Sequence, residues 1–124
     1  MFKFLMIFIG GGLGSLLRFR FSVFFSKPST TVFPLSTFCV NIIGCFLIGL
    51  FYTSSVRYTS VSTEWRLFLI TGFCGGFTTF SAFAYENVML LREGNTAIFI
   101  LYSISSFVLS FLAVLAGINI FKLL

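Results

Sequence analysis

The sequence predicts an all-α integral membrane protein with four transmembrane helices, because its composition is strongly apolar and four long segments are nearly free of charge. Of its 124 residues, 58% are hydrophobic and only 9% are charged. A soluble domain of this length needs far more charged residues to cover its surface, so lipid must cover this one. A membrane-spanning helix requires roughly 20 mainly apolar residues. The length leaves room for one domain, residues 1–124.

The four predicted spans follow one another with short polar connections. They cover residues 2–25, 33–53, 65–91 and 96–121. The connections contain turn-forming and charged residues, at 27–31, 57–63 and 92–95. Tyr52 and Trp65 fall at span ends, where amphipathic rings favour the headgroup level of the membrane.

Basic residues are distributed evenly between the two predicted sides of the membrane. Four spans place both termini and the second connection on one side, and the first and third connections on the other. Each side then carries four Lys or Arg residues, so the positive-inside rule has no bias on which to act. We therefore expect the chain to insert in both orientations and to form an antiparallel, dual-topology homodimer. The alternative is that the helix ends lie a few residues away and leave a small bias.

Composition excludes several other classes of function. The net charge is +5, but the eight basic residues are scattered singly, whereas a nucleic-acid-binding protein gathers them on one face. There is no histidine, and Cys39, Cys45 and Cys74 lie in apolar segments without a CxxC spacing. A buried, inert thiol is the expected state of each. Without a catalytic constellation, an enzyme is not expected.

The third predicted span has a glycine-rich and polar centre. Residues 71–83 contain three glycines within five positions, followed by two threonines, and both features weaken a helix. We expect this helix to be broken in the middle of the membrane, where freed carbonyls can coordinate a cation and freed amides favour an anion. The alternative is an intact helix in which Gly72 and Gly76 form a small-xxx-small packing face.

Two phenylalanines and one asparagine stand out within the spans. Phe80 and Phe83 are three residues apart and therefore share a helix face. Such a pair usually only packs, and the chain has twenty phenylalanines; alternatively, ring edges turned towards a pore favour a small anion. Asn41 lies in the middle of the second span, where an unpaired amide is costly. Its NH2 group either links two helices or donates to an anion along a path.

The fourth span carries a stripe of hydroxyl groups. Tyr102, Ser106 and Ser110 are spaced four residues apart, on one side of a helix, and Ser103 lies beside them. Serine commonly packs between membrane helices, so the stripe predicts either a helix contact or a polar track across the membrane.

Two charged residues near the spans, Arg18 and Glu86, each have two possible roles. Arg18, which follows Gly10 and Gly14 in the first span, either reaches the interface or gives an anion vestibule its positive potential. Glu86 lies one turn after Phe83 and is the only acidic residue near membrane depth. It is either a proton carrier or a partner for an arginine at the interface.

Three segments together resemble the Fluc (CrcB) family of fluoride channels. They are Gly11-Gly12-Leu13-Gly14-Ser15-Leu16-Leu17-Arg18, Pro34-Leu35-Ser36-Thr37-Phe38-Cys39-Val40-Asn41-Ile42-Ile43-Gly44 and Gly72-Phe73-Cys74-Gly75-Gly76-Phe77-Thr78-Thr79-Phe80-Ser81-Ala82-Phe83. The third segment is the most specific, and the similarity covers almost the whole chain. Ser36, Ala82 and Ala84 depart mildly from the family pattern.

The resemblance implies an antiparallel homodimer with two fluoride pores in the bacterial plasma membrane. Fluoride would leave the cytoplasm passively, which would give fluoride resistance. Asn41 matches the asparagine that donates to fluoride, and the family's pore-lining positions match Phe80, Phe83, Tyr102, Ser106 and Ser110. The carbonyls of Gly75 and Thr78 match those that hold a structural Na⁺ at the dimer centre. Arg18 matches the arginine that ends the first-helix motif.

The main alternative function is a proton-coupled small multidrug-type exporter, which is also a four-span, dual-topology dimer. That mechanism needs a carboxylate deep in an early helix to exchange protons for a cationic drug. The first two predicted spans contain none, and Glu86 is poorly placed for the task.

Overall fold

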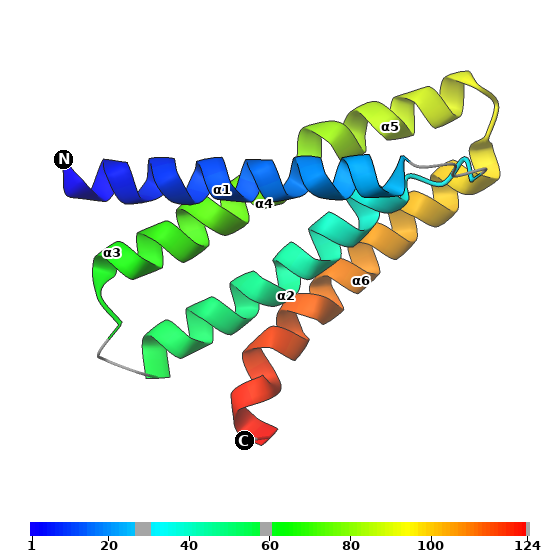
Figure 1. Ribbon diagram of the computed structural model, residues 1–124. Helices are drawn as coiled ribbons and strands as arrows, with labels where there is room; N and C mark the ends of the chain where they lie inside the picture. The colour runs from blue at the N-terminus through cyan, green and yellow to red at the C-terminus, as the bar shows by residue number, and fades with distance from the viewer. Residues whose placement is uncertain (27–30, 58–60, 124) are drawn as a thin grey trace.

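The computed structural model consists of helices and short connections, with no strands, over the residues that it describes, which are 1–26, 31–57 and 61–123 (Figure 1). In chain order the elements are α1 (Phe2–Phe25), α2 (Leu35–Arg57), α3 (Thr63–Arg66), the π-helix η1 (Leu67–Cys74), α4 (Gly75–Phe77), α5 (Phe80–Arg92) and α6 (Thr96–Leu123). Most of the turn predicted at 27–31, and residues 58–60 of the second connection, lie outside the described residues.

The prediction of four membrane-spanning helices is confirmed. Four helical stretches are long and apolar enough to cross a membrane, at Phe2–Phe25, Leu35–Arg57, Thr63–Arg92 and Thr96–Ile120. Both termini and the facing ends of α2 and α3 lie towards one end of the molecule (Figure 1). The far end of α1, the start of α2 and the α5–α6 connection lie towards the other end, as a four-span topology requires.

The second helix is shifted relative to its predicted bounds of 33 and 53. It begins at Leu35 because Phe33 precedes Pro34, and a residue before proline is disfavoured in the helical region. It continues to Arg57 because Ser54 and Ser55 donate their hydroxyls to carbonyls of the preceding turn, both at 2.7 Å. Because these hydroxyls are hydrogen-bonded within the helix, the helix continues past residue 53, where the apolar stretch ends.

Glycines allow α1 to cross the third span in backbone contact. A Cβ atom on Gly10 or Gly14 would collide with backbone carbonyl oxygens of η1. From the other side, a Cβ on Gly72 would lie 2.9 Å from the carbonyl oxygen of Ile7, and one on Gly76 would collide with α1 as well. Gly72 and Gly76 therefore have the close-packing role that the small-xxx-small pattern predicts.

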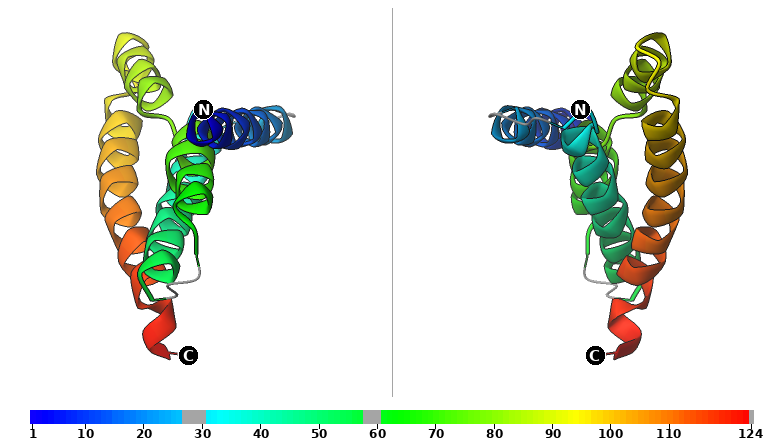
Figure 2. Two further views of the ribbon diagram at one scale, coloured as in Figure 1. Left: turned by 90° about the vertical axis from the view of Figure 1, so that its left-hand side faces the viewer. Right: turned by 90° about the vertical axis from the view of Figure 1, so that its right-hand side faces the viewer.

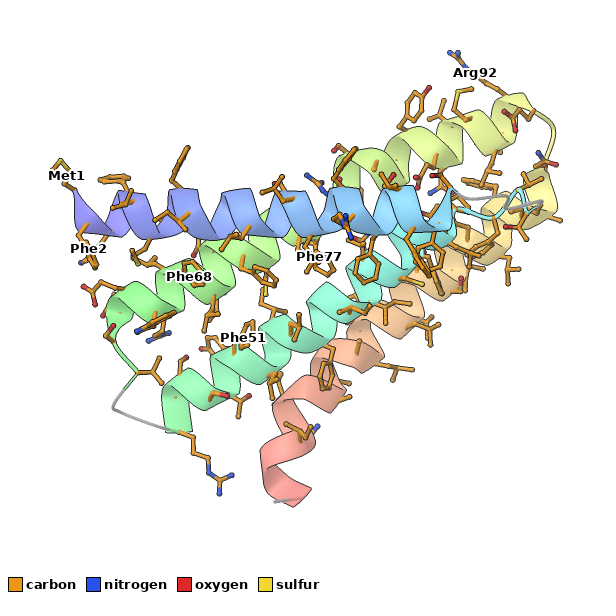
Figure 3. The ribbon with its side chains drawn as sticks, in the orientation of Figure 1. Met1, Phe2, Phe51, Phe68, Phe77 and Arg92 are labelled. Carbon is orange, nitrogen blue, oxygen red and sulfur yellow. The ribbon has the colours of Figure 1, made fainter. Side chains whose placement is uncertain are left out.

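The other close helix pair is α2 with α6, which run side by side (Figure 1). Gly49 of α2 and Gly117 of α6 face the partner backbone, where a Cβ on either would collide with a carbonyl oxygen. Figure 2 shows α1 on one side of α2 and of the α3–α4 segment, with α5 and α6 on the other side. Phe77, which is only 1% exposed, fills the space between α1 and α2 (Figure 3).

Regular helical geometry is interrupted between α4 and α5. Thr78 (φ −77°, ψ 157°) and Thr79 (φ −151°, ψ 120°) have extended backbone. Gly75, in contrast, is helical (φ −63°, ψ −38°), so the glycines that weaken the segment are not themselves the extended residues. The side chain of Thr79 caps α5 by accepting the backbone N–H of Ala82 at 3.2 Å.

Candidate functional site

An open cavity of about 570 Å³ lies between α2, the η1–α4 segment, the start of α5 and the middle of α6. Its wall is mainly apolar, with a few hydroxyl, thiol and amide groups. The lining residues are Asn41, Gly44, Cys45, Ile48, Ile70, Thr71, Cys74, Gly75, Thr78, Thr79, Phe80, Phe83, Ser106, Phe107, Ser110 and Phe111. The cavity thus brings together seven residues that the sequence analysis singled out from three different spans: Asn41, Gly75, Thr78, Phe80, Phe83, Ser106 and Ser110.

Asn41 both links two helices and lines the cavity. Its Nδ2 donates to the carbonyl oxygen of Thr79 at 3.0 Å, and its Oδ1 accepts the backbone N–H of Thr79 at 2.8 Å. The amide therefore replaces the hydrogen bonds that the extended backbone at Thr79 cannot make within a helix. Since an asparagine NH2 carries two hydrogens, one N–H remains after the bond to Thr79.

Phe80 and Phe83 share a face, as their spacing predicts. Their ring centroids are 5.7 Å apart and their planes are tilted by 42°. Phe80 is 79% exposed, whereas Phe83 is partly buried and packs against Tyr102 at a centroid distance of 5.1 Å. Both rings line the open side of the cavity.

The hydroxyl stripe on α6 divides into two parts. Ser106 and Ser110 line the cavity, but Tyr102 does not. Instead, Tyr102 is fully buried among aromatic rings, and its hydroxyl donates to Glu86 at 2.7 Å. Ser106 is 7% exposed, and its Oγ has no hydrogen-bond partner among the described residues. A buried hydroxyl without a partner is costly, and each such group calls for an explanation.

Glu86 has two hydroxyl partners that the sequence analysis did not assign to it. Thr37 of α2 donates to one carboxylate oxygen at 2.7 Å, and Tyr102 of α6 donates to the other at 2.7 Å. The carboxylate therefore links three helices, rather than pairing with an arginine at the membrane interface. Spacing within single helices places Thr37 one turn before Asn41 and Glu86 one turn after Phe83, but it does not identify them as partners.

A second polar link adjoins Glu86 along the chain. Asn87 accepts the hydroxyl of Ser103 at 2.8 Å and donates to the carbonyl oxygen of Phe83 at 2.9 Å. These side chains line a second cavity of about 550 Å³ between α5 and α6, which shares Phe83 and Phe107 with the first. The sequence places Ser103 beside the predicted stripe, and no pattern in it indicates a role for Asn87.

Gly75 and Thr78 line the cavity, whereas Arg18 does not. A Cβ on Gly75 would meet nothing within 4 Å, so the backbone there faces open space. The hydroxyl of Thr78 donates to the carbonyl oxygen of Cys74 at 2.9 Å. Arg18 is a partly exposed residue of α1, one turn after Gly14.

A family model and individual known proteins both show similarity to this chain. Residues 5–118 match the family model described as CrcB-like protein, Camphor Resistance (CrcB). The chain is 48% identical to the fluoride-specific ion channel FluC of Phocaeicola vulgatus, over 92% of this chain and 93% of that protein. It is 50% identical to FluC of Bacteroides fragilis, over 90% and 89% of the two chains. FluC of Rhizobium leguminosarum bv. trifolii is 40% identical, over 100% and 99%.

Proposed function

Because this chain belongs to the CrcB-like protein family and is a multi-pass bacterial membrane protein, we propose that it is a fluoride-selective ion channel. Relatives that are 40–50% identical over most of their length are named fluoride-specific ion channels. Fluoride leaves the cytoplasm passively, down its electrochemical gradient, so that the cell resists external fluoride. The activity is transport and not catalysis.

The observation that carries this proposal is the hydroxyl of Ser106, which lies in the wall of a mainly apolar cavity and has no hydrogen-bond partner in the described part of the chain. Fluoride is small and strongly hydrated, so a pore must replace its water with hydrogen-bond donors. The Ser106 hydroxyl and the remaining N–H of Asn41 are such donors, from α6 and α2 respectively. A fluoride ion passing between them would satisfy the group that the folded chain leaves unsatisfied.

The rings of Phe80 and Phe83 complete this path in our proposal. An aromatic ring has a positive edge, which attracts an anion without providing a full counter-charge. Among the described residues neither lysine nor arginine lines the cavity, so no charged side chain traps the ion there. Weak, successive contacts of this kind suit fast passage.

We place the interruption at Thr78 and Thr79 at membrane depth, in an antiparallel, dual-topology homodimer. Irregular backbone is tolerated in a membrane only where protein or a polar cavity surrounds it, and Asn41 together with the cavity provides both. The high exposure of Phe80, Phe107 and Phe111 along the open cavity supports a second copy as its cover. The even distribution of basic residues supports opposite orientations.

The same region fits a structural Na⁺. The helix that ends at Phe77 leaves last-turn carbonyls without intrahelical partners, and neutral oxygen donors suit a hard monovalent cation. The carbonyls of Gly75 and Thr78 would hold the ion, and the open space beside Gly75 leaves room for it. The ion would supply a fixed positive charge that stabilises the meeting of two copies.

A flux assay with two adjacent serines tests the proposal. Purified protein is reconstituted into liposomes loaded with potassium fluoride, valinomycin is added, and a fluoride electrode follows efflux, with chloride measured in parallel. Ser106→Ala should slow fluoride efflux about tenfold or more, because one donor to a desolvated anion is lost. Ser105→Ala is the matched control, since the Ser105 hydroxyl donates to the carbonyl of Leu101 at 2.6 Å on the exposed side.

The phenylalanine rings are tested in the same assay. Phe80→Ile and Phe83→Ile should each abolish fluoride release while the protein remains monodisperse. Wild-type protein that releases no fluoride would refute the channel and direct attention to proton-coupled export. Normal efflux from Ser106→Ala would instead refute the role assigned to its hydroxyl.

A further inference from the structure

We propose that Cys45 and Cys74 form a two-thiol binding site for a soft d10 metal cation, of the class of Hg²⁺, Ag⁺ and Cu⁺, in the wall of the cavity. Both side chains line the 570 Å³ cavity, one from α2 and one from the end of η1. Neither thiol is in a disulfide. Cys39, the third cysteine, does not line the cavity.

The register of the two helices places the thiols at the same level. Asn41 of α2 is bonded to Thr79, and a Cβ on Gly44 would collide with the side chain of Thr78. One helical turn after Asn41 is Cys45, and one turn before Thr78 is Cys74. Since the two segments run in opposite directions, these steps lead to facing positions.

Two hydrogen bonds hold the backbone at Cys74. The Thr78 hydroxyl and backbone N–H both donate to the carbonyl oxygen of Cys74, at 2.9 and 3.0 Å. Cys74 is 1% exposed and belongs to the cavity wall, so its thiol does not lie on the outer surface. Because the two thiols are already in facing positions, binding a cation does not cost the conformational entropy of bringing two flexible groups together.

The donor set selects a soft cation. Thiolates favour Cu⁺ and related soft ions, whereas hard cations prefer oxygen ligands. Neither histidine nor a carboxylate lines the cavity beside them. On binding, Hg²⁺ forms one bond to each sulfur and each thiol releases its proton, so two protons leave and no group is oxidised or reduced.

Occupation of this site should block ion passage, an effect that rests on the proposed channel function. The cation and its bonds would lie beside Gly75 and Thr78, in the same cavity as the Ser106 hydroxyl. They would narrow the cavity along our proposed path. Binding itself can be measured without any flux.

Mercuric chloride is the probe, and Cys39→Ser is the starting protein, because it retains only the proposed pair. The protein is titrated in detergent micelles without any other thiol, while sulfur-to-mercury charge-transfer absorbance and released protons are recorded. A separate titration, in which glutathione competes for Hg²⁺, compares the affinities of the variants. We expect one Hg²⁺ per chain and two protons per Hg²⁺. Adding Cys45→Ser or Cys74→Ser should weaken binding by roughly 100-fold or more, because the chelating second thiol is lost.

Two results would overturn the proposal that both thiols bind the same cation. Undiminished binding in the Cys45→Ser protein would show that Cys74 acts without it, for example with Cys74 of a second copy. Release of a single proton per Hg²⁺ from the Cys39→Ser protein would show that only one thiol is bound, and this result needs no further variant. The comparison is repeated with Cys45→Ala, after size-exclusion chromatography has shown that this variant elutes like the starting protein and is therefore folded.

The flux measurement separates this proposal from the channel proposal. One Hg²⁺ per chain should stop fluoride efflux from liposomes that contain the Cys39→Ser protein. A small dithiol, which removes Hg²⁺ from the protein, should restore the efflux. Tight binding with unchanged efflux would overturn the blocking effect but not the site. Absence of efflux before any Hg²⁺ is added would overturn the channel function, while absorbance and proton release would still report on the thiol pair.

Discussion

Replacement of Asn41 by alanine should strongly destabilise the protein. Asn41 makes two hydrogen bonds to the backbone of Thr79, at 2.8 and 3.0 Å, and Thr79 is only 9% exposed. Asn41→Ala leaves one buried N–H and one buried C=O unpaired, at about 1–3 kcal/mol each. The free energy of unfolding should therefore fall by about 2–6 kcal/mol.

Reversible unfolding in mixed micelles, followed by far-UV circular dichroism and the fluorescence of the single tryptophan, Trp65, measures this change. Asn119→Ala is the matched control, because its amide donates only to the carbonyl of Leu115, within its own helix and at the exposed surface, at 2.8 Å. The control should change the free energy by less than about 0.5 kcal/mol. If Asn41→Ala behaves like the control, the pairing with Thr79 does not hold the interruption in place, and our reasoning about this residue is wrong.

Two further matched pairs test the packing and the buried carboxylate. Gly14→Ala should destabilise the protein by about 1–3 kcal/mol, because its Cβ meets the backbone of the third span, whereas Gly12→Ala meets nothing within 4 Å and should be neutral in the same unfolding assay. Tyr102→Phe should cost about 1.5–3 kcal/mol by removing a hydrogen bond to the carboxylate of Glu86, and Tyr85→Phe, whose side chain is 66% exposed, should not. If the two variants of a pair lower the free energy of unfolding equally, the contact assigned to Gly14 or to Tyr102 does not contribute to stability.

Features that depend on one helix at a time could be predicted from the sequence. Helix spacing alone places Phe80 with Phe83 and Ser106 with Ser110, and the structure keeps each pair on the cavity side. The hydropathy of each span similarly predicts the four helices. These features follow from a periodicity that the sequence carries directly.

Features that join several helices could not be predicted in the same way. Glu86 meets Thr37 and Tyr102 from two other helices, and the spacing within its own helix carries no information about them. The same applies to the backbone of Thr79 as the partner of Asn41. Within a single span, the π-helical geometry of η1 also had no visible pattern, since its residues are those of an ordinary apolar helix.

The packing order of the helices has a consequence for how the protein is made. The glycine-lined face of α1 fits the third span, and that of α2 fits α6, so each of the first two helices has its close partner later in the chain. During synthesis, the first two spans enter the membrane before those partners exist. Their orientation must therefore be decided by flanking charges alone, before any tertiary contact can favour one direction. Premature release of a two-span fragment would leave the glycine faces of both helices without the partners that cover them in the complete chain.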